Sequence, residues 1–483
     1  MSPEQLPETT LTKTDFKLFL ECPREFWLKR YHPEQIVTPI DAHGRYLIRQ
    51  GYEVEREARA LIAREFSVDA LESQYTVTFE NLLARFDILR MNDDGTVAIY
   101  EVKSSKHIPR LESAKSKREK REKNLYDLAF QVHVARLSGL VVSEAFLVTL
   151  DGDYVRGEDL EIEKALHFED VTEEVTGLHR DVQLKVSEAM SVLQNGPGDG
   201  FEGLCKAKLK CAYFVFAQPE LPETTIFDIP RISDKRIESL RRQGVLAVED
   251  VPGSADLTGT QMAFVEKCKN PPPRMVDIHG ISAILSELEY PLHFLDYETV
   301  NPALPKFRGM RPYEQVTFQY SVHVVESEGS EPIHYEYLSD GTGDPQSDLL
   351  KGLREAIGDA GSVISWNKSF EIKQNELLGR LFPEYAEFID SLNARMFDLA
   401  DPFRLGLYFD PAICGWSIKN VLPVLVPGMN YDDLDIGGGA AASALWYMDV
   451  FEGTEDKQER MKQLREYCSQ DTLAMVKIFE VLR

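Results

Sequence analysis

Apolar residues dominate residues 291–300, and this pattern predicts a buried β-strand that carries two acids. The stretch reads Pro-Leu-His-Phe-Leu-Asp-Tyr-Glu-Thr-Val, with the acids at Asp296 and Glu298. Because side chains two residues apart on a strand share a face, both carboxylates should point the same way. Two neighbouring carboxylates in an apolar setting are costly unless they are paired or bind a cation. The pattern therefore predicts a divalent metal site on a central strand.

A second pair of acids lies in a predicted β-hairpin. Residues 82–89 and 97–103 read as strands on either side of the turn signal Asn-Asp-Asp-Gly. Asp87 and Glu101 are equidistant from the turn and should face each other, with Lys103 on the face of Glu101. A bound cation would explain two opposed acids, and Lys103 would orient the attacking water or stabilise charge at a phosphate. The alternative is a surface hairpin with scattered charges, which its apolar neighbours disfavour.

Helical periodicity predicts two helices beside this hairpin. Residues 46–66 are amphipathic, with Glu55 near the apolar face, and residues 125–140 carry Gln131. Taken alone, Glu55 is more simply a solvated helix acid.

Residues 11–31 follow a broadly helical pattern, and we expect Thr14 or Asp15 to be the N-cap. Cys22 lies in the middle of this pattern, in the sequence Cys-Pro-Arg. Taken alone, Cys22 is best interpreted as a small buried residue.

Strand-like and helix-like segments alternate in the C-terminal part, which is typical of α/β layers. Residues 316–325 and 363–366 read as strands, and the second leads into a helix with Glu371 near its N-terminus, where negative charge is favoured. The last helix carries Tyr467 and Asp471, which are four residues apart and therefore share a face. Asp471 would complete a metal site with the strand acids, and Tyr467 would place a phenol beside it.

These patterns divide the 483 residues into three expected parts, residues 1–217, 218–284 and 285–483. The first and last are α/β, and the middle is a helical linker. Its capped helix at residues 233–243 and the basic residues around it resemble helix-hairpin-helix units that grip a DNA backbone. A plain spacer domain is the alternative.

The formal net charge of −26 argues against a sequence-independent coat for nucleic acid, which would need a positive surface. It does not exclude a nuclease, whose metal sites are acidic and whose substrate needs only a local basic track. Residues 103–123 hold nine Lys or Arg against three acids. This segment is equally compatible with a phosphate-tracking element and with a solvated helix.

Six cysteines scattered along the chain favour a reducing, cytoplasmic setting over a disulfide framework. The charged first twenty residues predict no secretory leader. No apolar run reaches the roughly 18 residues of a membrane span, so no membrane partner is expected.

The N-terminal pattern resembles the RecB-like branch of the PD-(D/E)XK nucleases, including its CRISPR-associated members. The matching residues are Asp87, the Glu101-Val102-Lys103 triplet and Gln131. The resemblance implies a restriction-endonuclease-like fold in which Asp87 and Glu101 hold Mg²⁺ or Mn²⁺, while Lys103 and Gln131 serve catalysis. Glu55 stands where the family usually has a helical histidine, and it still offers a metal ligand.

The CRISPR-associated members carry an iron–sulphur cluster, held by one early cysteine and three later ones. Cys22, Cys205 and Cys211 match three of these positions, but the last would fall near Ala217. Three thiolates do not complete a four-ligand cluster, so we expect the cluster to have been lost. A remote Cys268 or a non-cysteine ligand would complete it.

The C-terminal set is similar to the DnaQ-like exonucleases of the RNase H-like fold, tyrosine subtype. The resemblance implies that Asp296, Glu298, Glu371 and Asp471 hold two Mg²⁺ or Mn²⁺ ions and that Tyr467 orients the attacking water. That family usually has Asp where Glu371 stands, which changes the reach to the metal by one methylene group.

Together the two resemblances match an uncharacterised bacterial and archaeal family, known mostly as a domain of unknown function, that joins such a nuclease to such an exonuclease. Its members share the segment at residues 415–419, Tyr431 and the glycines at residues 437–439. Ser417 and Lys419 are candidates for contact with a substrate phosphate.

The leading hypothesis is a bifunctional, metal-dependent nuclease that acts on single-stranded or end-frayed DNA in repair or defence. Its C-terminal site would remove nucleotides from 3′ ends, and its N-terminal site would cut phosphodiester bonds. One alternative is a nucleic-acid-binding adaptor with one or both sites degenerate. The other is an RNA-directed exonuclease.

Overall fold

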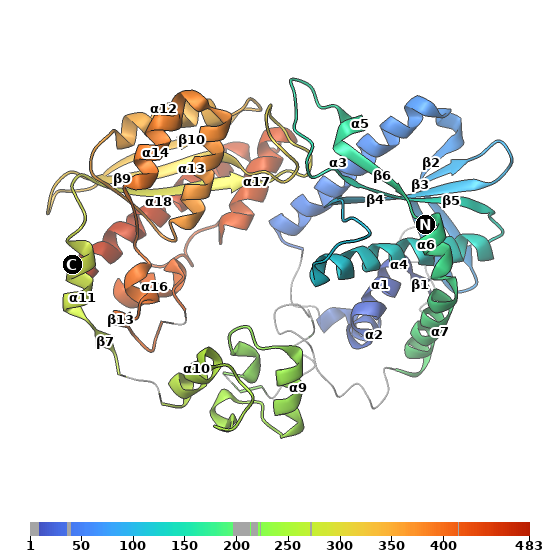
Figure 1. The fold of residues 1–483 in the computed structure, drawn as a ribbon, viewed down its shortest axis with the longest axis horizontal. Helices are drawn as coiled ribbons and strands as arrows, with labels where there is room; N and C mark the ends of the chain where they lie inside the picture. Colours follow the sequence, from blue (N-terminus) through green and yellow to red (C-terminus); the bar gives the residue numbers. More distant parts are fainter. Residues whose placement is uncertain are drawn as a thin grey trace. The chain divides into compact units, whose positions relative to one another are not determined.

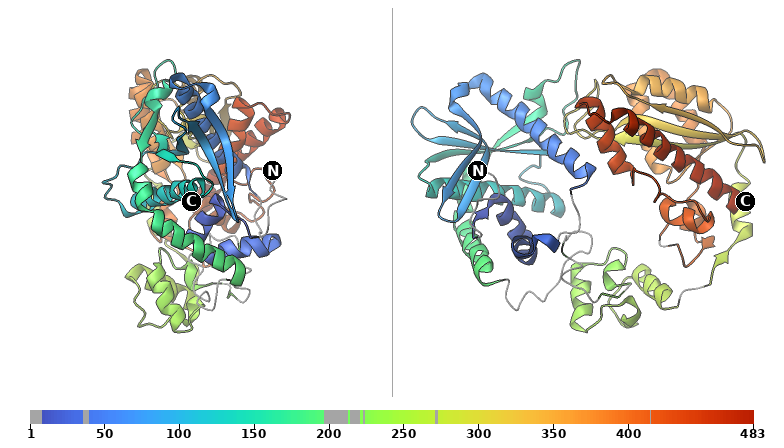
Figure 2. Two further views of the ribbon diagram at one scale, coloured as in Figure 1. Left: turned by 90° about the vertical axis from the view of Figure 1, so that its right-hand side faces the viewer. Right: turned by 180° about the vertical axis from the view of Figure 1, so that it is seen from behind.

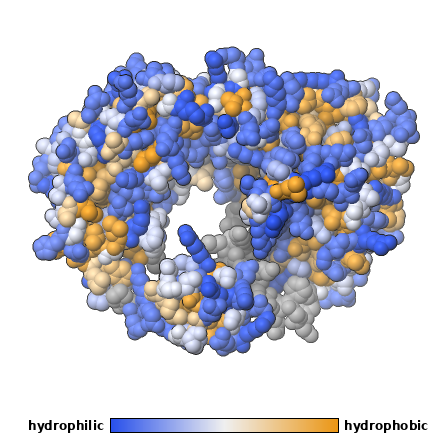
Figure 3. All heavy atoms as spheres, viewed as in Figure 1, coloured by the Kyte–Doolittle hydropathy of each residue, from blue (hydrophilic) through white to orange (hydrophobic). Residues whose placement is uncertain are grey.

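The computed structural model describes residues 9–35, 40–196, 213, 221–222, 224–270, 273–413 and 415–483. The chain divides into two compact units of mixed α/β structure (Figure 1). The first unit comprises Met1–Pro39, Gln50–Tyr154 and Leu160–Pro271, and the second comprises Ile40–Arg49, Val155–Asp159 and Pro272–Arg483. No described helix has the length and apolarity needed to cross a bilayer. Hydrophilic residues cover much of the face shown in Figure 3.

The sheet of the first unit has the order β1-β3-β4-β5-β6, with β2 also paired to β3. Its strands are β1 (Leu11–Thr12), β2 (Leu71–Phe79), β3 (Leu82–Met91), β4 (Val97–Lys106), β5 (Val142–Leu150) and β6 (Leu166–Asp170). Its helices are α1 (Lys13–Glu21), α2 (Pro23–Tyr31), α3 (Ala42–Glu65, which begins in the second unit), α4 (Lys115–Leu137), α5 (Ile162–Ala165), α6 (Thr172–Gly177) and α7 (His179–Asn195). The core of this unit includes Phe16 of α1 stacked on Phe130 of α4, with ring centroids 4.7 Å apart.

The predicted hairpin is present as β3 and β4, and its register is the predicted one. Ile88 pairs with Tyr100 and Met91 pairs with Val97. One position beyond this ladder the same register places Asp87 opposite Glu101. Gly95 has a φ of 79°, the left-handed conformation that the turn signal predicts.

The prediction for residues 11–31 is wrong in two details. Two helices replace one, because Cys22 is extended and Pro23 begins α2. The N-cap of α1 is Thr12, whose side chain accepts from the Asp15 backbone N–H at 3.1 Å. Asp15 Oδ2 in turn accepts from the Thr12 backbone N–H at 3.3 Å, so Asp15 belongs to a capping box rather than being the cap itself.

The described residues of the middle part form a small core of their own around Ile226, Ile237, Leu240 and Val265. Its helices are α9 (Asp234–Arg242) and α10 (Gly259–Lys269). Between these two helices, Val248–Asp250 form a short 3₁₀ turn. Similarity to helix-hairpin-helix units stays a prediction.

The sheet of the second unit has the order β10-β9-β8-β11-β12, which places the acid-bearing strand β8 at its centre, as predicted. Its strands are β8 (Leu292–Val300), β9 (Val316–Val325), β10 (Ile333–Leu338), β11 (Ser362–Ser365) and β12 (Met396–Asp398); β7 (Met275–Val276) pairs separately with β13 (Tyr408–Phe409). The strands and helices do not alternate throughout this unit, because β8, β9 and β10 pair antiparallel in succession. β11 then adds parallel to β8.

Helices bury both faces of this sheet. One face packs in a core that contains α16 (Ile418–Leu425), α17 (Gly439–Phe451) and α18 (Lys457–Leu482); α11 (Ile278–Leu285) and α15 (Asp401–Arg404) also contribute residues. The other packs against α12 (Gln346–Ile357), α13 (Ser369–Leu381) and α14 (Ala386–Ala394). In Figure 2 the red helix α18 lies against the yellow strands, and its Phe479 meets Phe294 of β8 edge-on at 5.7 Å. Acids on β8 are therefore held in a largely dry environment.

We predict that Gly361→Ala destabilises the second unit by about 3 kcal/mol. Gly361 has a φ of 78°, and a Cβ there would lie 2.0 Å from the carbonyl oxygen of Pro291, just before β8. Urea unfolding would measure the loss. Gly343→Ala is the matched control, because a Cβ at Gly343 meets open space; equal midpoints for the two variants would contradict the prediction.

Candidate metal centre

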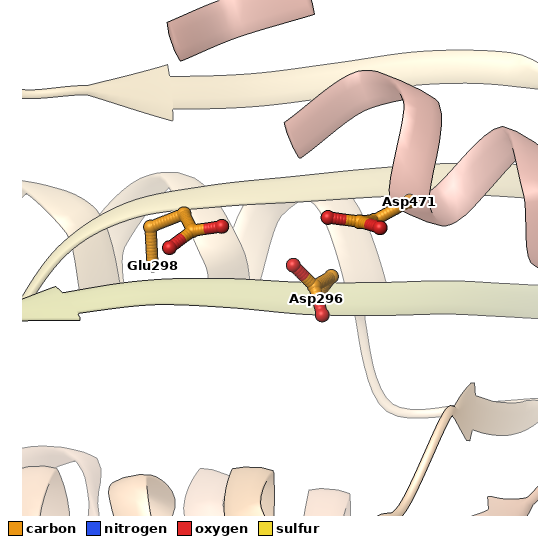
Figure 4. A group of neighbouring side chains, drawn as sticks. All are labelled: Asp296, Glu298 and Asp471. Atoms are coloured by element: carbon orange, nitrogen blue, oxygen red, sulfur yellow. The ribbon is translucent and has the colours of Figure 1, made fainter. Parts of the chain in front are cut away.

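Three carboxylates from two elements converge in the second unit. Asp296 and Glu298 come from β8, and Asp471 comes from α18 (Figure 4). One ligand oxygen from each lies within 4.8 Å of the others, an arrangement that could hold a metal ion. Among the described residues, no other set of three or more His, Cys, Asp or Glu forms such a group. The two-residue period of the strand and the packing of α18 on β8 produce this convergence.

Burial and mutual repulsion raise the pKa values of these acids above their ordinary range. Burial raises the pKa of Glu298 to about 8 and that of Asp471 to about 6, with the charge of Asp471 adding to the shift at Glu298. Burial and the charges of Asp471, Glu298 and Glu371 raise the pKa of Asp296 well above its ordinary value. Carboxylate oxygens are the ligands that Mg²⁺ and Mn²⁺ prefer, so the donor set fits such an ion.

Glu371 lies near this group but outside it. It sits in the first turn of α13, is 2% exposed, and its charge contributes to the raised pKa of Asp296. Burial raises the pKa of Glu371 itself to about 8, and its Oε2 has no hydrogen-bond partner among the described residues. An unpartnered buried carboxylate oxygen is costly, and a cation would satisfy it.

Asp398, a further acid near the site, holds the turn that delivers Glu371. It accepts hydrogen bonds from the backbone N–H groups of Asn367 at 3.0 Å and Lys368 at 3.2 Å, and it pairs with Arg404 at 3.1 Å. Asn367 has a φ of 68°, so this turn carries strain that Asp398 offsets. Asp398 is therefore a structural residue.

Two tyrosines and a lysine complete the surroundings of Asp471. The Tyr431 hydroxyl donates to Asp471 Oδ1 at 2.6 Å. Burial, followed by the charge of Asp471, raises the pKa values of Tyr431 and Tyr467 far above normal, so both phenols stay protonated. Lys419 lies over both rings, at 5.1 and 5.3 Å from their centroids. The sequence offered no spacing rule that links Tyr431 to Asp471 across forty positions.

The acid cluster opens into a cavity of about 420 Å³ in the second unit. His43 and Tyr46 form part of the cavity wall, and both belong to the segment Ile40–Arg49 that is assigned to the second unit. Tyr46 packs edge-on against Tyr447 at 5.0 Å, and Nδ1 of His43 is buried without a hydrogen-bond partner among the described residues. The other lining residues include Asn301, Gln315, Trp366, Phe370, Ser417, Lys419, Ser443 and Tyr467. Periodicity within residues 46–66 could not reveal this contribution, because it depends on tertiary packing.

The N-terminal acids are held by lysines. Lys13 Nζ lies 3.1 Å from both carboxylate oxygens of Glu101 and 3.5 Å from Asp87. Lys103 binds Glu101 and lies 2.5 Å from Asp127 Oδ2. Lys17 lies 3.2 Å from the same Asp127 oxygen, and Gln131 donates to Glu101 Oε2 at 2.6 Å. Three carboxylates thus face three ammonium groups.

These pairs control protonation at the N-terminal acids. Burial alone would raise the pKa of Glu101, but Lys103 and Lys13 outweigh it and keep the carboxylate charged. Burial and the charge of Glu101 raise the pKa of Asp87 to about 7 despite the two lysines. With the lysines so placed, the acids do not present the uncompensated charge that would fit a divalent ion.

Glu55 is not gathered into a group with Asp87 and Glu101 among the described residues. Its carboxylate accepts a hydrogen bond from Gln74 at 2.7 Å. The sequence interpretation also missed Lys13 and Asp127. Asp127 lies four residues before Gln131 on the same helix, so helical spacing could have revealed it; Lys13 comes from a distant helix.

Cys22 caps α2, with its Sγ accepting from the Glu25 N–H at 3.4 Å. Cys205 and Cys211 lie outside the described residues, so the expected loss of an iron–sulphur cluster stays a prediction.

Ion pairs balance much of the charge in the basic segment at residues 103–123. Arg121 contacts Glu169 at 2.7 Å and Glu174 at 2.8 Å. Further pairs are Arg110–Glu169, Lys115–Glu119, Lys117–Glu112 and Lys123–Glu21. Fewer lysine and arginine side chains of this segment are thus available to bind a phosphate of a nucleic acid.

Residues 293–417 match a family described as a domain of unknown function, DUF2779. The matched segment contains Asp296, Glu298 and Glu371 and ends before Asp471. The crystal structure of a protein named SSO0001 is similar with a TM-score of 0.27 and 15% identity, over 45% of this chain and 89% of that one. A similarity of this size carries no argument about fold. No curated protein matches the sequence.

We predict that the metal-free protein becomes less stable as the pH rises. The pKa of Glu298 is about 8 in the folded protein against an ordinary 4.5, so the folded state binds a proton that the unfolded chain releases between these values. The free energy of unfolding should therefore decrease from pH 4.5 to about 8, and Mn²⁺ should restore it at pH 8. Glu298→Gln should flatten this slope in thermal unfolding, whereas exposed Asp433→Asn should not; identical slopes in all three proteins would refute the argument.

We also predict that Tyr431→Phe weakens Mn²⁺ binding by at least about tenfold, because the Asp471 carboxylate loses the hydroxyl that orients it. Calorimetric titration would measure the affinity. Tyr335→Phe, at a 41% exposed tyrosine, is the control. An unchanged affinity in Tyr431→Phe would show that this phenol does not act on the metal centre.

Proposed function

We propose that this chain is a metal-dependent nuclease whose hydrolytic centre is the acid cluster of the second unit. The observation that carries the proposal is the convergence of Asp296, Glu298 and Asp471 in one cavity with a protonated phenol nearby. Buried acids that repel one another contribute nothing favourable to the metal-free fold, so a bound cation is the natural reason for their presence. The order of the acids along the chain is similar to that of DnaQ-like exonucleases, and this supports an RNase H-like interpretation of the unit.

Asp296, Glu298 and Asp471, with Glu371 beside them, would hold Mg²⁺ or Mn²⁺, which supplies an activated water and stabilises charge on a leaving oxygen. Tyr467 keeps its proton because burial and the charge of Asp471 raise its pKa. Its hydroxyl therefore serves as a hydrogen-bond donor that orients the nucleophilic water rather than as a base. Tyr431 fixes the Asp471 carboxylate through the hydrogen bond from its hydroxyl.

A single strand of nucleic acid is the proposed substrate, attacked from its 3′ end. The cavity of about 420 Å³ includes Trp366 and Phe370 beside polar Asn301 and Gln315. Aromatic rings stack on bases without regard to sequence, and amides hydrogen-bond to base edges or sugars. DNA in repair or defence is the proposed setting, with RNA as the alternative substrate.

We predict that wild-type protein with Mn²⁺ shortens 5′-labelled single strands stepwise from the 3′ end. Asp296→Asn should reduce the rate at least a hundredfold, since loss of a ligand should exceed the effect of losing a supporting group. Tyr467→Phe should reduce it by roughly a hundredfold while leaving Mn²⁺ affinity nearly unchanged. Asp433→Asn is the matched surface control. Full activity in Asp296→Asn would overturn the proposal for this site.

The lysine pairing in the first unit favours a second candidate role for that unit, as a nucleic-acid-binding or adaptor element with a degenerate site. Lys13 occupies both oxygens of Glu101, so a divalent ion there would have to displace an ammonium group. If the first unit is a RecB-like nuclease, Asp87→Asn should reduce the total cleavage activity. If it is an adaptor, Asp87→Asn should leave the activity unchanged, and Asp296→Asn alone should remove all of it.

A further inference from the structure

We propose that Lys419 binds the substrate phosphate in the cavity of the second unit. The inference rests on the proposed nuclease function and adds to it a residue that positions the phosphodiester. Lys419 belongs to the first turn of α16, well separated in sequence from each member of the acid cluster.

The ammonium group of Lys419 is held at the edge of the acid cluster by neutral groups. Its Nζ donates to the carbonyl oxygen of Gly437 at 2.6 Å and lies over the rings of Tyr431 and Tyr467. These are the same two tyrosines that flank Asp471. The side chain is therefore fixed beside the acid cluster, and it lines the cavity.

The charge of Lys419 has no partner of opposite sign within ion-pair distance. Among the described residues no carboxylate lies within 4.0 Å of its Nζ, although Lys419 acts at longer range to lower the pKa values of Glu298 and Asp471. By contrast, the half-buried Arg460 of this unit pairs directly with Asp449 at 2.8 Å, and the more exposed Arg404 pairs with Asp398 at 3.1 Å. Of the lining residues that the structure describes, Lys419 is the single lysine or arginine.

Charge balance indicates what completes this arrangement. The four acids Asp296, Glu298, Glu371 and Asp471 carry four negative charges when ionised, and two divalent cations would neutralise them. Lys419 then leaves one positive charge in the cavity. A phosphodiester group brings one negative charge and acceptor oxygens, so it neutralises the site and satisfies the ammonium group.

The glycines at residues 437–439 keep this corner of the cavity open. A Cβ on Gly438 would lie 3.4 Å from Lys419 Nζ, and a Cβ on Gly439 would lie 3.4 Å from Glu298 Oε2. Longer side chains at these positions would occupy space beside both charged groups. The absence of side chains at Gly438 and Gly439 thus favours access to Lys419 and Glu298.

The competing explanation is a purely structural role, in which Lys419 clamps the two tyrosines through cation–π contacts. Replacing Lys419 with an uncharged side chain of similar length, such as Met, would have a different effect under each of the two roles. A clamp affects thermal stability or Mn²⁺ affinity, whereas a phosphate contact affects the dependence of substrate binding on salt and on substrate charge.

The test measures binding of the full-length protein to a fluorescent single-stranded oligonucleotide by anisotropy. Wild type, Lys419→Met and Lys419→Arg are compared across salt concentrations, with Mn²⁺ affinity measured in parallel. Each protein is also given the same strand with an uncharged, uncleavable methylphosphonate at the 3′-terminal linkage, and the natural linkage is measured at temperatures where cleavage is slow. Lys351→Met, at an exposed helical lysine, is the control.

We expect Lys419→Met to bind the natural strand about tenfold more weakly and to lose roughly 0.7 from the slope of log affinity against log salt, the value of one phosphate contact on a single strand. Lys419→Arg should retain the wild-type slope. Wild type should prefer the charged linkage about tenfold, and Lys419→Met should discriminate clearly less than wild type.

An unchanged slope and retained discrimination in Lys419→Met, with cleavage by wild type intact, would overturn this inference and leave the nuclease proposal standing. If Lys419→Met does not fold, the comparison of linkages on wild type decides, because equal affinity for both linkages overturns the inference. Wild type that neither binds nor cleaves any strand would overturn the nuclease proposal as well.

Discussion

Repulsion between buried carboxylates is the constraint on which the second unit depends. Asp296 and Glu298 sit on the central strand of a sheet covered by helices on both faces, and Asp471 is packed onto them by the last helix. The apolar contacts of β8, α17 and α18 hold this costly group in place. Tyr431 and Lys419 reduce the cost only at Asp471 and Glu298. Because the fold holds these carboxylates together without a neutralising cation of its own, it is suited to bind one from solution.

In the first unit, the protein's own lysines compensate the negative charge of a similar group of largely buried acids. Glu101 and Asp127 pair with lysines, Asp87 shares Lys13 with Glu101, and Glu101 stays charged as a result. The two sets of acids therefore differ in whether they need a cation from solution to neutralise their charge. The cluster of the second unit is electrostatically incomplete, whereas that of the first is closed by the protein's own side chains. Similar acid pairs in sequence thus need not indicate similar chemistry.

Local periodicity predicted the parts of both sites that lie within one element. The two-residue period put Asp296 and Glu298 on one face, turn symmetry set Asp87 opposite Glu101, and helical spacing joined Tyr467 to Asp471. Sequence reasoning failed where a contact joins distant elements, as for Lys13, Tyr431 and His43, because packing rather than spacing creates those neighbours. It also failed at Thr12, where a reciprocal pair of hydrogen bonds decides which residue is the cap.

The chain does not give each unit one continuous segment. Residues 40–49 and 155–159 belong with the C-terminal unit although the segments around them belong with the N-terminal one. Of these, the first carries His43 and Tyr46 into the wall of the cavity. A recombinant fragment cut at residue 272 would thus be deprived of part of its binding pocket and of a buried tyrosine. The same interleaving means that no single continuous segment of the chain carries the complete C-terminal site.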